Sequence, residues 1–168
     1  MNSEKLLKWV KEHDIKLRAI KVFWEVLHNW RTDDSDFDSD YGEMNPRLIH
    51  LEFDKISFTH LFENGDYIEV RLRIYYNEDY IGSFRPIYTL DGEHEDEFLT
   101  FENKDYIRLL VETTNTAIEI AEKALKEEIP VEVVHKITDL SLSLIEEIKS
   151  DRVELKDNLI MMPLKKRD

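Results

Sequence analysis

The spacing of apolar residues changes twice along the chain, and this feature constrains the possible fold more than any other. In residues 1–30 apolar side chains recur every three or four positions, as on one face of a helix. In residues 48–101 they recur at every second position, which is typical of strands, and the helical spacing returns after residue 102. This order predicts an α+β fold: a long N-terminal helix, an antiparallel β-meander of about four strands, and two C-terminal helices packed on one sheet face.

The N-terminal helix is predicted from one apolar stripe. Its members are Leu6, Val10, His13, Leu17, Ile20, Trp24 and Leu27. Ser3 is the predicted N-cap, because its hydroxyl can accept a hydrogen bond from the first turn. A break at His13-Asp14 is the alternative, but we favour one long helix that packs against the sheet over two elements or a coiled-coil dimer.

The first two strands meet near Glu63-Asn64-Gly65, and the loop length decides their register. A two-residue Asn-Gly turn would mix apolar and charged residues on both faces. A three-residue loop with Gly65 left-handed in a bulge makes one face apolar throughout. We therefore predict the register that opposes His60 to Ile68, Phe58 to Val70 and Ile56 to Leu72.

The later elements are less regular. Residues 80–90 are the predicted third strand, in which Pro86 requires an edge position or a bulge because it cannot donate to a ladder. Residues 98–101 are the predicted fourth strand. Helices are predicted from Asn103 to just before Pro130 and again over residues 133–148.

No repeat or linker divides the chain, so we predict a single domain of residues 1–168. Within it, residues 31–46 are an expected acidic loop, and residues 151–168 are an expected C-terminal arm.

The chain is strongly acidic, with a formal net charge of −14 over 168 residues. Such a charge repels phosphate backbones and anionic lipid, so we expect no nucleic-acid partner and no membrane partner. A basic protein is the expected partner, although high charge also serves solubility alone.

The absence of cysteine and of a long apolar run predicts a cytoplasmic protein, and the Lys, Glu, Ile and Asp-rich composition is typical of bacterial or phage proteins.

Carboxylates gather in two runs that are candidate partner-binding surfaces: Asp33, Asp34, Asp36, Asp38, Asp40 and Glu43, then Glu93, Glu95, Asp96 and Glu97. The alternation of Asp36, Asp38 and Asp40 is that of a calcium loop, in which several oxygens converge on the ion. That pattern requires a glycine where Tyr41 stands and a carboxylate where Arg47 stands. A solvated acidic loop with at most weak calcium binding is therefore expected.

The predicted register also collects cations on the sheet face opposite the core: Lys55, Arg71, Arg73 and Arg85. Like charges side by side are unfavourable unless something neutralises them. Nearby carboxylates such as Glu69 can do so, an acidic segment of the same chain can cover the face, or the face can bind a phosphate or carboxylate through its arginines.

No catalytic motif is present. The four glycines are too scattered for a phosphate-binding loop, and neither a hydrolase elbow nor a zinc signature occurs. We therefore expect no cofactor and assign no catalytic residue. His60 is in phase with Ile56 and Phe58, so it is predicted to face the core or a pocket, more often as a satisfied buried histidine than as a base.

We therefore expect a non-enzymatic binding protein of the immunity or inhibitor type, which presents carboxylates to a basic protein. Mimicry of DNA is a variant of this expectation and requires a contiguous acidic ridge. One alternative is an anion-binding or small-molecule-binding protein, or an enzyme, that uses Arg71, Arg73 and Arg85. Another is a dimeric acidic secretion or assembly chaperone, which needs an exposed apolar groove; the sequence does not decide between monomer and dimer.

Overall fold

The computed structural model describes residues 1–61 and 65–157. The chain divides into two compact units, Met1–Glu112 and Thr113–Asp168, and one helix belongs to both. The single domain of residues 1–168 stays a prediction. No helix among the described residues is long and apolar enough to cross a membrane.

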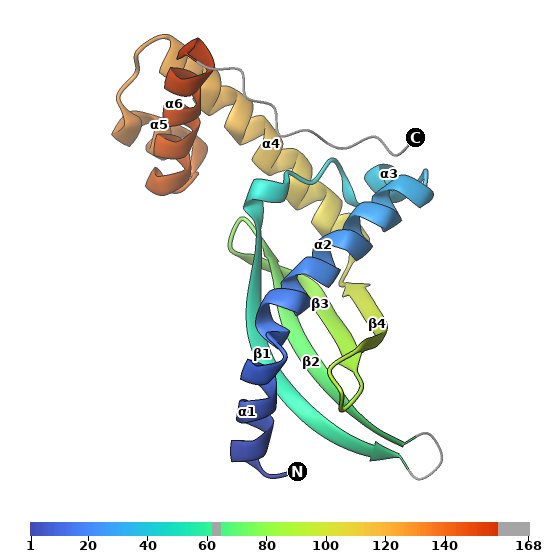
Figure 1. The fold of residues 1–168 in the computed structure, drawn as a ribbon. Helices are drawn as coiled ribbons and strands as arrows, with labels where there is room; N and C mark the ends of the chain where they lie inside the picture. The colour runs from blue at the N-terminus through green and yellow to red at the C-terminus, as the bar shows by residue number, and fades with distance from the viewer. Residues whose placement is uncertain (62–64, 158–168) are drawn as a thin grey trace. The chain divides into compact units, whose positions relative to one another are not determined.

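The first unit holds the sheet and the N-terminal helices, and the second unit is helical (Figure 1). The predicted α+β class is confirmed. The elements in chain order are α1 (Ser3–Glu12), α2 (Ile15–Asp33), α3 (Phe37–Tyr41), the 3-10 helix η1 (Pro46–Leu48), β1 (Ile49–Leu61), β2 (Gly65–Tyr76), β3 (Asp79–Tyr88), β4 (His94–Phe101), α4 (Lys104–Lys126), α5 (Val131–Thr138) and α6 (Leu142–Asp157).

The predicted single N-terminal helix is wrong, because the chain breaks at His13-Asp14. Asp14 adopts a left-handed conformation with φ 49°, and Asn2 rather than Ser3 caps α1 through its side chain. Because of the break, α2 turns a different face to the sheet from the face that the single apolar stripe predicted. Leu17 is 71% exposed as a result, and the buried face of α2 consists of Ile15, Ala19, Phe23 and Leu27.

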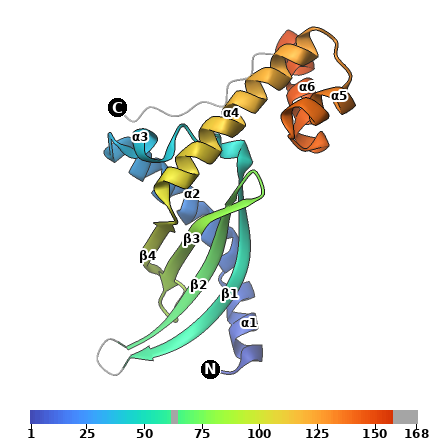
Figure 2. The ribbon, with the colours of Figure 1, turned by 180° about the vertical axis from the view of Figure 1, so that it is seen from behind.

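The four strands form one antiparallel meander in the order β1-β2-β3-β4 (Figure 2). The predicted β1–β2 register is wrong by two residues, since Phe58 lies opposite Ile68 and the last pair is Leu61 with Gly65. A shift of two keeps each side chain on its predicted face, because side chains alternate along a strand. Gly65 has φ 85°, in agreement with the predicted left-handed conformation.

A β-bulge in β1 changes the phase of that strand. Phe53 lies opposite Leu72 and Lys55 lies opposite Arg71, so Asp54 is the extra residue. The bulge brings Ile49, Leu51 and Phe53 onto the same face as Ile56 and Phe58. We call this the core face of the sheet and the opposite side the open face.

β3 is an internal strand, so the edge position considered for Pro86 is wrong. β2 and β3 pair at Leu72–Phe84 and again at Glu69–Ile87, but no partners are assigned to Arg85 and Pro86 between them. The register is the same on both sides of this gap, so the alternative of a bulge at Pro86 is wrong as well. The gap in the pairing falls where proline lacks the N–H that a ladder needs.

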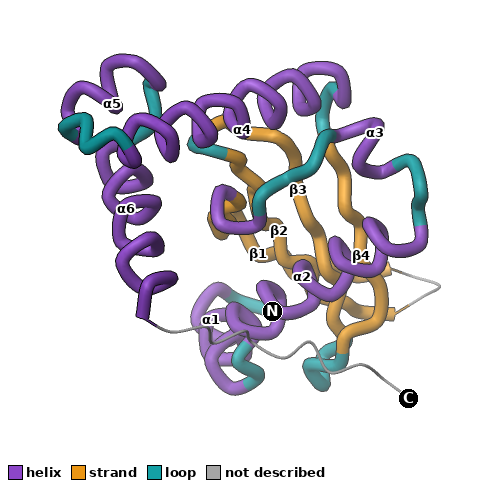
Figure 3. The backbone as a smooth tube through the Cα atoms, turned by 90° about the horizontal axis from the view of Figure 1, so that it is seen from above, coloured by secondary structure: helices purple, strands orange, loops and turns teal. Residues whose placement is uncertain are grey.

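α1 and α2 lie on the core face (Figure 3). The Phe23 ring of α2 contacts Phe84 with centroids 5.6 Å apart, and the Trp9 ring of α1 contacts Tyr88 at 6.4 Å. The covering rings therefore come from the N-terminal helices. Residues 31–46 are not a plain loop, because they include α3 and bury Phe37 and Met44.

The second unit has a core of its own. This cluster consists of Ala121, Ala124, Val131, Val134, Leu140 and Ile145. The predicted helix over residues 133–148 is broken at Asp139, which has φ 57° and ends α5. The predicted arm begins as the last turns of α6 up to Asp157, and residues 158–168 lie outside the described residues.

Candidate functional site

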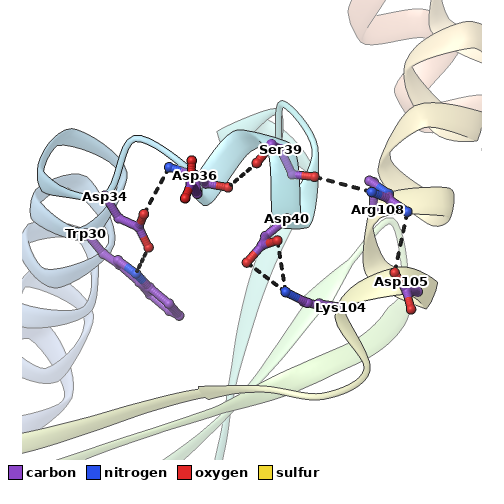
Figure 4. A network of polar contacts seen from close by, with 8 residues as sticks. All are labelled: Trp30, Asp34, Asp36, Ser39, Asp40, Lys104, Asp105 and Arg108. Carbon is purple, nitrogen blue, oxygen red and sulfur yellow. Dashed lines mark hydrogen bonds and ion pairs between the residues drawn. The ribbon is translucent and has the colours of Figure 1, made fainter.

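The first acidic run is folded around α3 and is largely paired within the first unit (Figure 4). Asp34 accepts hydrogen bonds from the indole N–H of Trp30 at 3.2 Å and from the backbone N–H of Asp36 at 2.9 Å. Asp38 pairs with Arg31 at 3.0 Å. These carboxylates thus hold the end of α2 to α3 rather than pointing freely to solvent.

Asp40 joins α3 to the start of α4. Its two carboxylate oxygens accept from Lys104 Nζ at 2.9 and 3.0 Å, and Arg108 donates to the carbonyl of Ser39 at 3.5 Å (Figure 4). The hydrogen bonding of Lys104 to Asp40, followed by the negative charge of that carboxylate, raises the pKa of Lys104. Two exposed carboxylates of the run, Asp33 and Asp36, have no cationic partner among the described residues.

The predicted weak calcium site at Asp36, Asp38 and Asp40 is not assembled around a common point. Asp38 and Asp40 each pair with a different cation, Arg31 and Lys104. Within residues 1–61 and 65–157, no cluster of three metal-ligating side chains of the His, Cys, Asp or Glu type is found. Glu43 lies beyond α3 and has further interactions within the chain.

The second acidic run lies in a strand, because β4 begins at His94 rather than at Phe98. Glu97 pairs with His94 Nε2 at 3.0 Å. Glu93, Glu95 and Asp96 are exposed, and in the described part of the chain no cation pairs with them. Among the described residues, this run therefore has three exposed carboxylates without a cation, compared with two in the first run.

β4 is an edge strand, and the hydrogen bonds show which of its backbone groups face outward. Glu102 N–H donates to the carbonyl of Ile81 at 2.9 Å, so this pair is hydrogen-bonded across β3 and β4. Because such pairs alternate along an antiparallel ladder, Thr100 and Phe98 also face β3, whereas Phe101, Leu99 and Glu97 face outward. Consistently, Glu97 N–H donates to the carboxylate of Asp96 at 2.9 Å instead of to β3.

The two acidic runs lie at opposite ends of β4. Phe101, at one end, stacks on Trp30 with centroids 5.6 Å apart and contacts Tyr41 at 5.0 Å, which places α3 there. Glu93 and Glu95 lie at the other end, about 24 Å away for a strand of this length. The main feature of this unit is thus the outward-facing edge of β4, with exposed carboxylates near both of its ends. We call this edge, together with Asp33, Asp36, Glu93, Glu95 and Asp96, the acidic edge.

The predicted cationic stripe lies on the open face and is largely neutralised. Arg73 pairs with Asp54 at 2.7 Å, and Arg71 Nε lies 3.6 Å from the same carboxylate, too far for a hydrogen bond. Arg85 lies 3.7 Å from Glu69 and 5.1 Å above the ring of Phe98. Lys55 has no carboxylate partner among the described residues.

His60 lies near the hairpin end of β1 and not in the core. Its side chain is 59% exposed and pairs with Asp66. The alternation of apolar residues placed it on the core face, but the helices do not cover that face this far along the hairpin, as Figure 1 shows. The prediction that His60 is buried in the core is therefore wrong.

Two features of the first unit were not predicted. A hollow of about 160 Å³ lies between α1, α2 and the bulge of β1, and its formation depends on the helix break, which was only the less favoured alternative, and on the unpredicted bulge. The hydroxyl of Tyr88 is buried and finds no hydrogen-bond partner among the described residues. Burial raises the pKa of Tyr88 to about 12, with a smaller opposing effect from Arg18.

Comparison with protein-family models, with curated proteins and with solved structures finds no match for this chain. The functional proposals below therefore rest on the geometry of the described residues.

Proposed function

We propose that this chain is a non-enzymatic binding protein that pairs the acidic edge with an extended segment of a basic partner protein. The observation that carries the proposal is the outward-facing backbone of Glu97, Leu99 and Phe101 in a strand with exposed carboxylates. Addition of a strand to an open sheet edge supplies backbone hydrogen bonds, and side chains along the edge supply selectivity.

Charge favours a basic segment at this edge. Glu93, Glu95 and Asp96 are exposed near the start of β4, and Asp33 and Asp36 are exposed beyond its end. The other edge strand, β1, mixes charges, since it carries Lys55 and histidines as well as carboxylates. An approaching basic strand is therefore attracted to β4 more strongly than to β1.

The side chains of β4 also offer an apolar contact. Phe98 is 45% exposed on the open face, beside Arg85. An aliphatic or aromatic residue of the added strand would lie diagonal to this ring and bury it, because cross-strand neighbours on one face lie within reach of aromatic side chains. The proposed partner segment thus alternates basic and apolar residues.

A designed peptide tests this proposal. The probe is a peptide of alternating lysine and valine, about nine residues long to match β4. We expect it to bind with an affinity that falls as salt rises, and we expect a version methylated on its valine amides to bind at least about tenfold more weakly, since it loses strand hydrogen bonds. Isothermal titration calorimetry measures both.

Matched variants separate charge from backbone pairing. Glu97→Gln removes a charge only, whereas Glu97→Pro also removes the outward N–H and leaves the hydrogen bonds to β3 in place. Glu97→Pro should weaken binding more than Glu97→Gln, and the exposed pair Glu119→Gln with Glu122→Gln on α4 should have little effect. Equal binding of the methylated peptide, or salt-independent binding, would contradict the proposal.

A further inference from the structure

An apolar hollow in the first unit is independent of the acidic edge. It lies between α1, α2 and the bulge of β1, and its apolar lining is Leu7, Val10, Ile15, Phe53, Ile56 and Val70. A wider outer hollow of about 400 Å³ shares Leu7 and Val10 and extends to Leu17. Leu7 and Leu17 are 59% and 71% exposed, which is costly for side chains of this size unless something covers them.

The rim of the two hollows is cationic, although the chain as a whole is anionic. Lys16 lines both hollows and Lys11 lines the outer one; Lys55 also borders the inner hollow, but its strand position places its side chain on the open face. None of these three lysines has a carboxylate partner among the described residues. Asp54 is held by Arg71 and Arg73, so Asp14 is the remaining carboxylate of the rim.

The position of Lys16 links the charge to the apolar lining. Its Nζ lies 5.3 Å from the centroid of the Phe53 ring, so the ammonium stands at the wall of the inner hollow. An anionic group bound there would lie beside a cation, while the rest of the molecule contacts aliphatic and aromatic side chains. Apolar cavities of roughly 150 Å³ accommodate a benzene ring, and the inner hollow has about this size.

We propose that these hollows bind a small amphipathic carboxylate, with an aryl or short alkyl group in the inner hollow and the carboxylate at the lysines of the rim. The site complements both parts of such a molecule, because its lining is apolar and its rim lacks enough carboxylates to neutralise the lysines. This ligand class differs from the basic segment proposed for the acidic edge, so either proposal can fail without the other.

The test uses 3-phenylpropionate as the probe and the uncharged 3-phenylpropan-1-ol as its control. Titration of the full chain, followed by NMR shifts of backbone amides, is expected to give a dissociation constant on the order of 1 mM or tighter for the carboxylate. The largest shifts should fall on α1, the start of α2 and the bulge of β1. The alcohol should bind at least about threefold more weakly, because it makes no charge interaction with the lysines.

Two variants test the two parts of the site. Lys16→Gln should weaken binding of 3-phenylpropionate about two- to fivefold, with Lys21→Gln on the same helix as the control that does not. Val10→Phe should fill the inner hollow and abolish binding, with Val26→Phe as the matched control, and thermal unfolding shows that each variant folds.

Several outcomes would overturn the proposal. These are equal affinity for the acid and the alcohol, amide shifts confined to other elements, and absence of binding by the wild-type chain. A self-association that Leu7→Ser abolishes, measured by sedimentation, would also overturn it, because a second copy would then occupy the hollow.

Discussion

At the scale of single residues, Tyr88 is a fully buried side chain that carries a polar group. Its ring is fully buried between Trp9 and His94, and its hydroxyl lacks a hydrogen-bond partner in the described part of the chain. A buried polar group without a partner costs roughly 1–3 kcal/mol of stability. The pKa of the phenol, about 12, reports the same unfavourable burial for its ionised form.

Tyr88→Phe should therefore stabilise the fold, by roughly 1 kcal/mol at neutral pH, because it removes the unpaired hydroxyl and keeps the ring. Burial raises the pKa of Tyr88 from 10.0 to about 12, so the folded chain holds the phenol proton more tightly than the unfolded chain does. The resulting contribution to the free energy of unfolding is complete below pH 10 and is lost as the pH rises from 10 through 12. The advantage of Tyr88→Phe should grow by about 2–3 kcal/mol over that range. Urea unfolding at pH 7 and pH 11 measures both effects; at pH 11, midway between the two pKa values, about half of this growth is expected.

The exposed Tyr80 provides the control for this pair of measurements. Tyr80→Phe should change stability little at either pH, because that ring is 37% exposed. A Tyr88→Phe variant that is less stable than the wild type at both pH values would show that the hydroxyl has a partner.

At the scale of elements, the helix break at Asp14 sets the face that α2 presents to the sheet. A left-handed conformation favours glycine, although aspartate tolerates it better than most residues. Asp14→Gly should therefore raise the free energy of unfolding by roughly 0.5–1 kcal/mol. Asp14→Asn removes the same charge without the conformational freedom of glycine, so equal stability of the two variants in urea unfolding would contradict this explanation.

The bulge at Asp54 controls the charge of the open face. Because Asp54 pairs with Arg71 and Arg73, phosphate should not raise the melting temperature of the wild-type chain above its value in chloride at matched ionic strength. Asp54→Asn should lose roughly 1 kcal/mol of stability, and phosphate should restore part of it by pairing with the released arginines.

Calorimetric melting of wild type, Asp54→Asn and the exposed control Asp91→Asn tests the open face. A phosphate-dependent rise in the wild type as large as that in Asp54→Asn would favour the alternative function, in which the arginines form an anion site.

The sequence pattern predicted what depends on alternation and missed what depends on single irregular residues. The apolar pattern determines which residues of β1 and β2 share a face. Two registers that differ by two residues place the same residues on each face, so the pattern cannot choose between these registers. The phase change between Phe53 and Ile56 is a visible signal of the bulge at Asp54. Residues 56–62, from which the register was predicted, lie beyond this phase change.

For the candidate site, the sequence indicated which residues are acidic but not which contacts they make. Both acidic runs were identified, but the pairing of Asp38 and Asp40 with Arg31 and Lys104 requires tertiary contacts that no local pattern encodes. The extension of β4 back to His94 was missed because charged residues have low strand propensity, and pairing with β3 overrides that preference here.

At the scale of the whole molecule, the net charge of −14 is distributed unevenly. Within the first unit, carboxylates that have no cationic partner among the described residues gather at both ends of β4, whereas Lys11 and Lys16 stand at the rim of the apolar hollow. A contiguous acidic ridge of the kind that DNA mimicry needs is interrupted along β4 by Phe98 and Leu99. This distribution fits an extended basic segment better than it fits a DNA-binding groove.

The most direct test of the proposed function is hydrogen exchange of the β4 amides in the presence of the lysine–valine peptide. The amides of Glu97, Leu99 and Phe101 face outward, so they should gain protection when the peptide binds, while Phe98 and Thr100, already bonded to β3, should change little. Unchanged exchange at the three outward amides with peptide bound, or new protection along β1 instead, would contradict strand addition at the acidic edge.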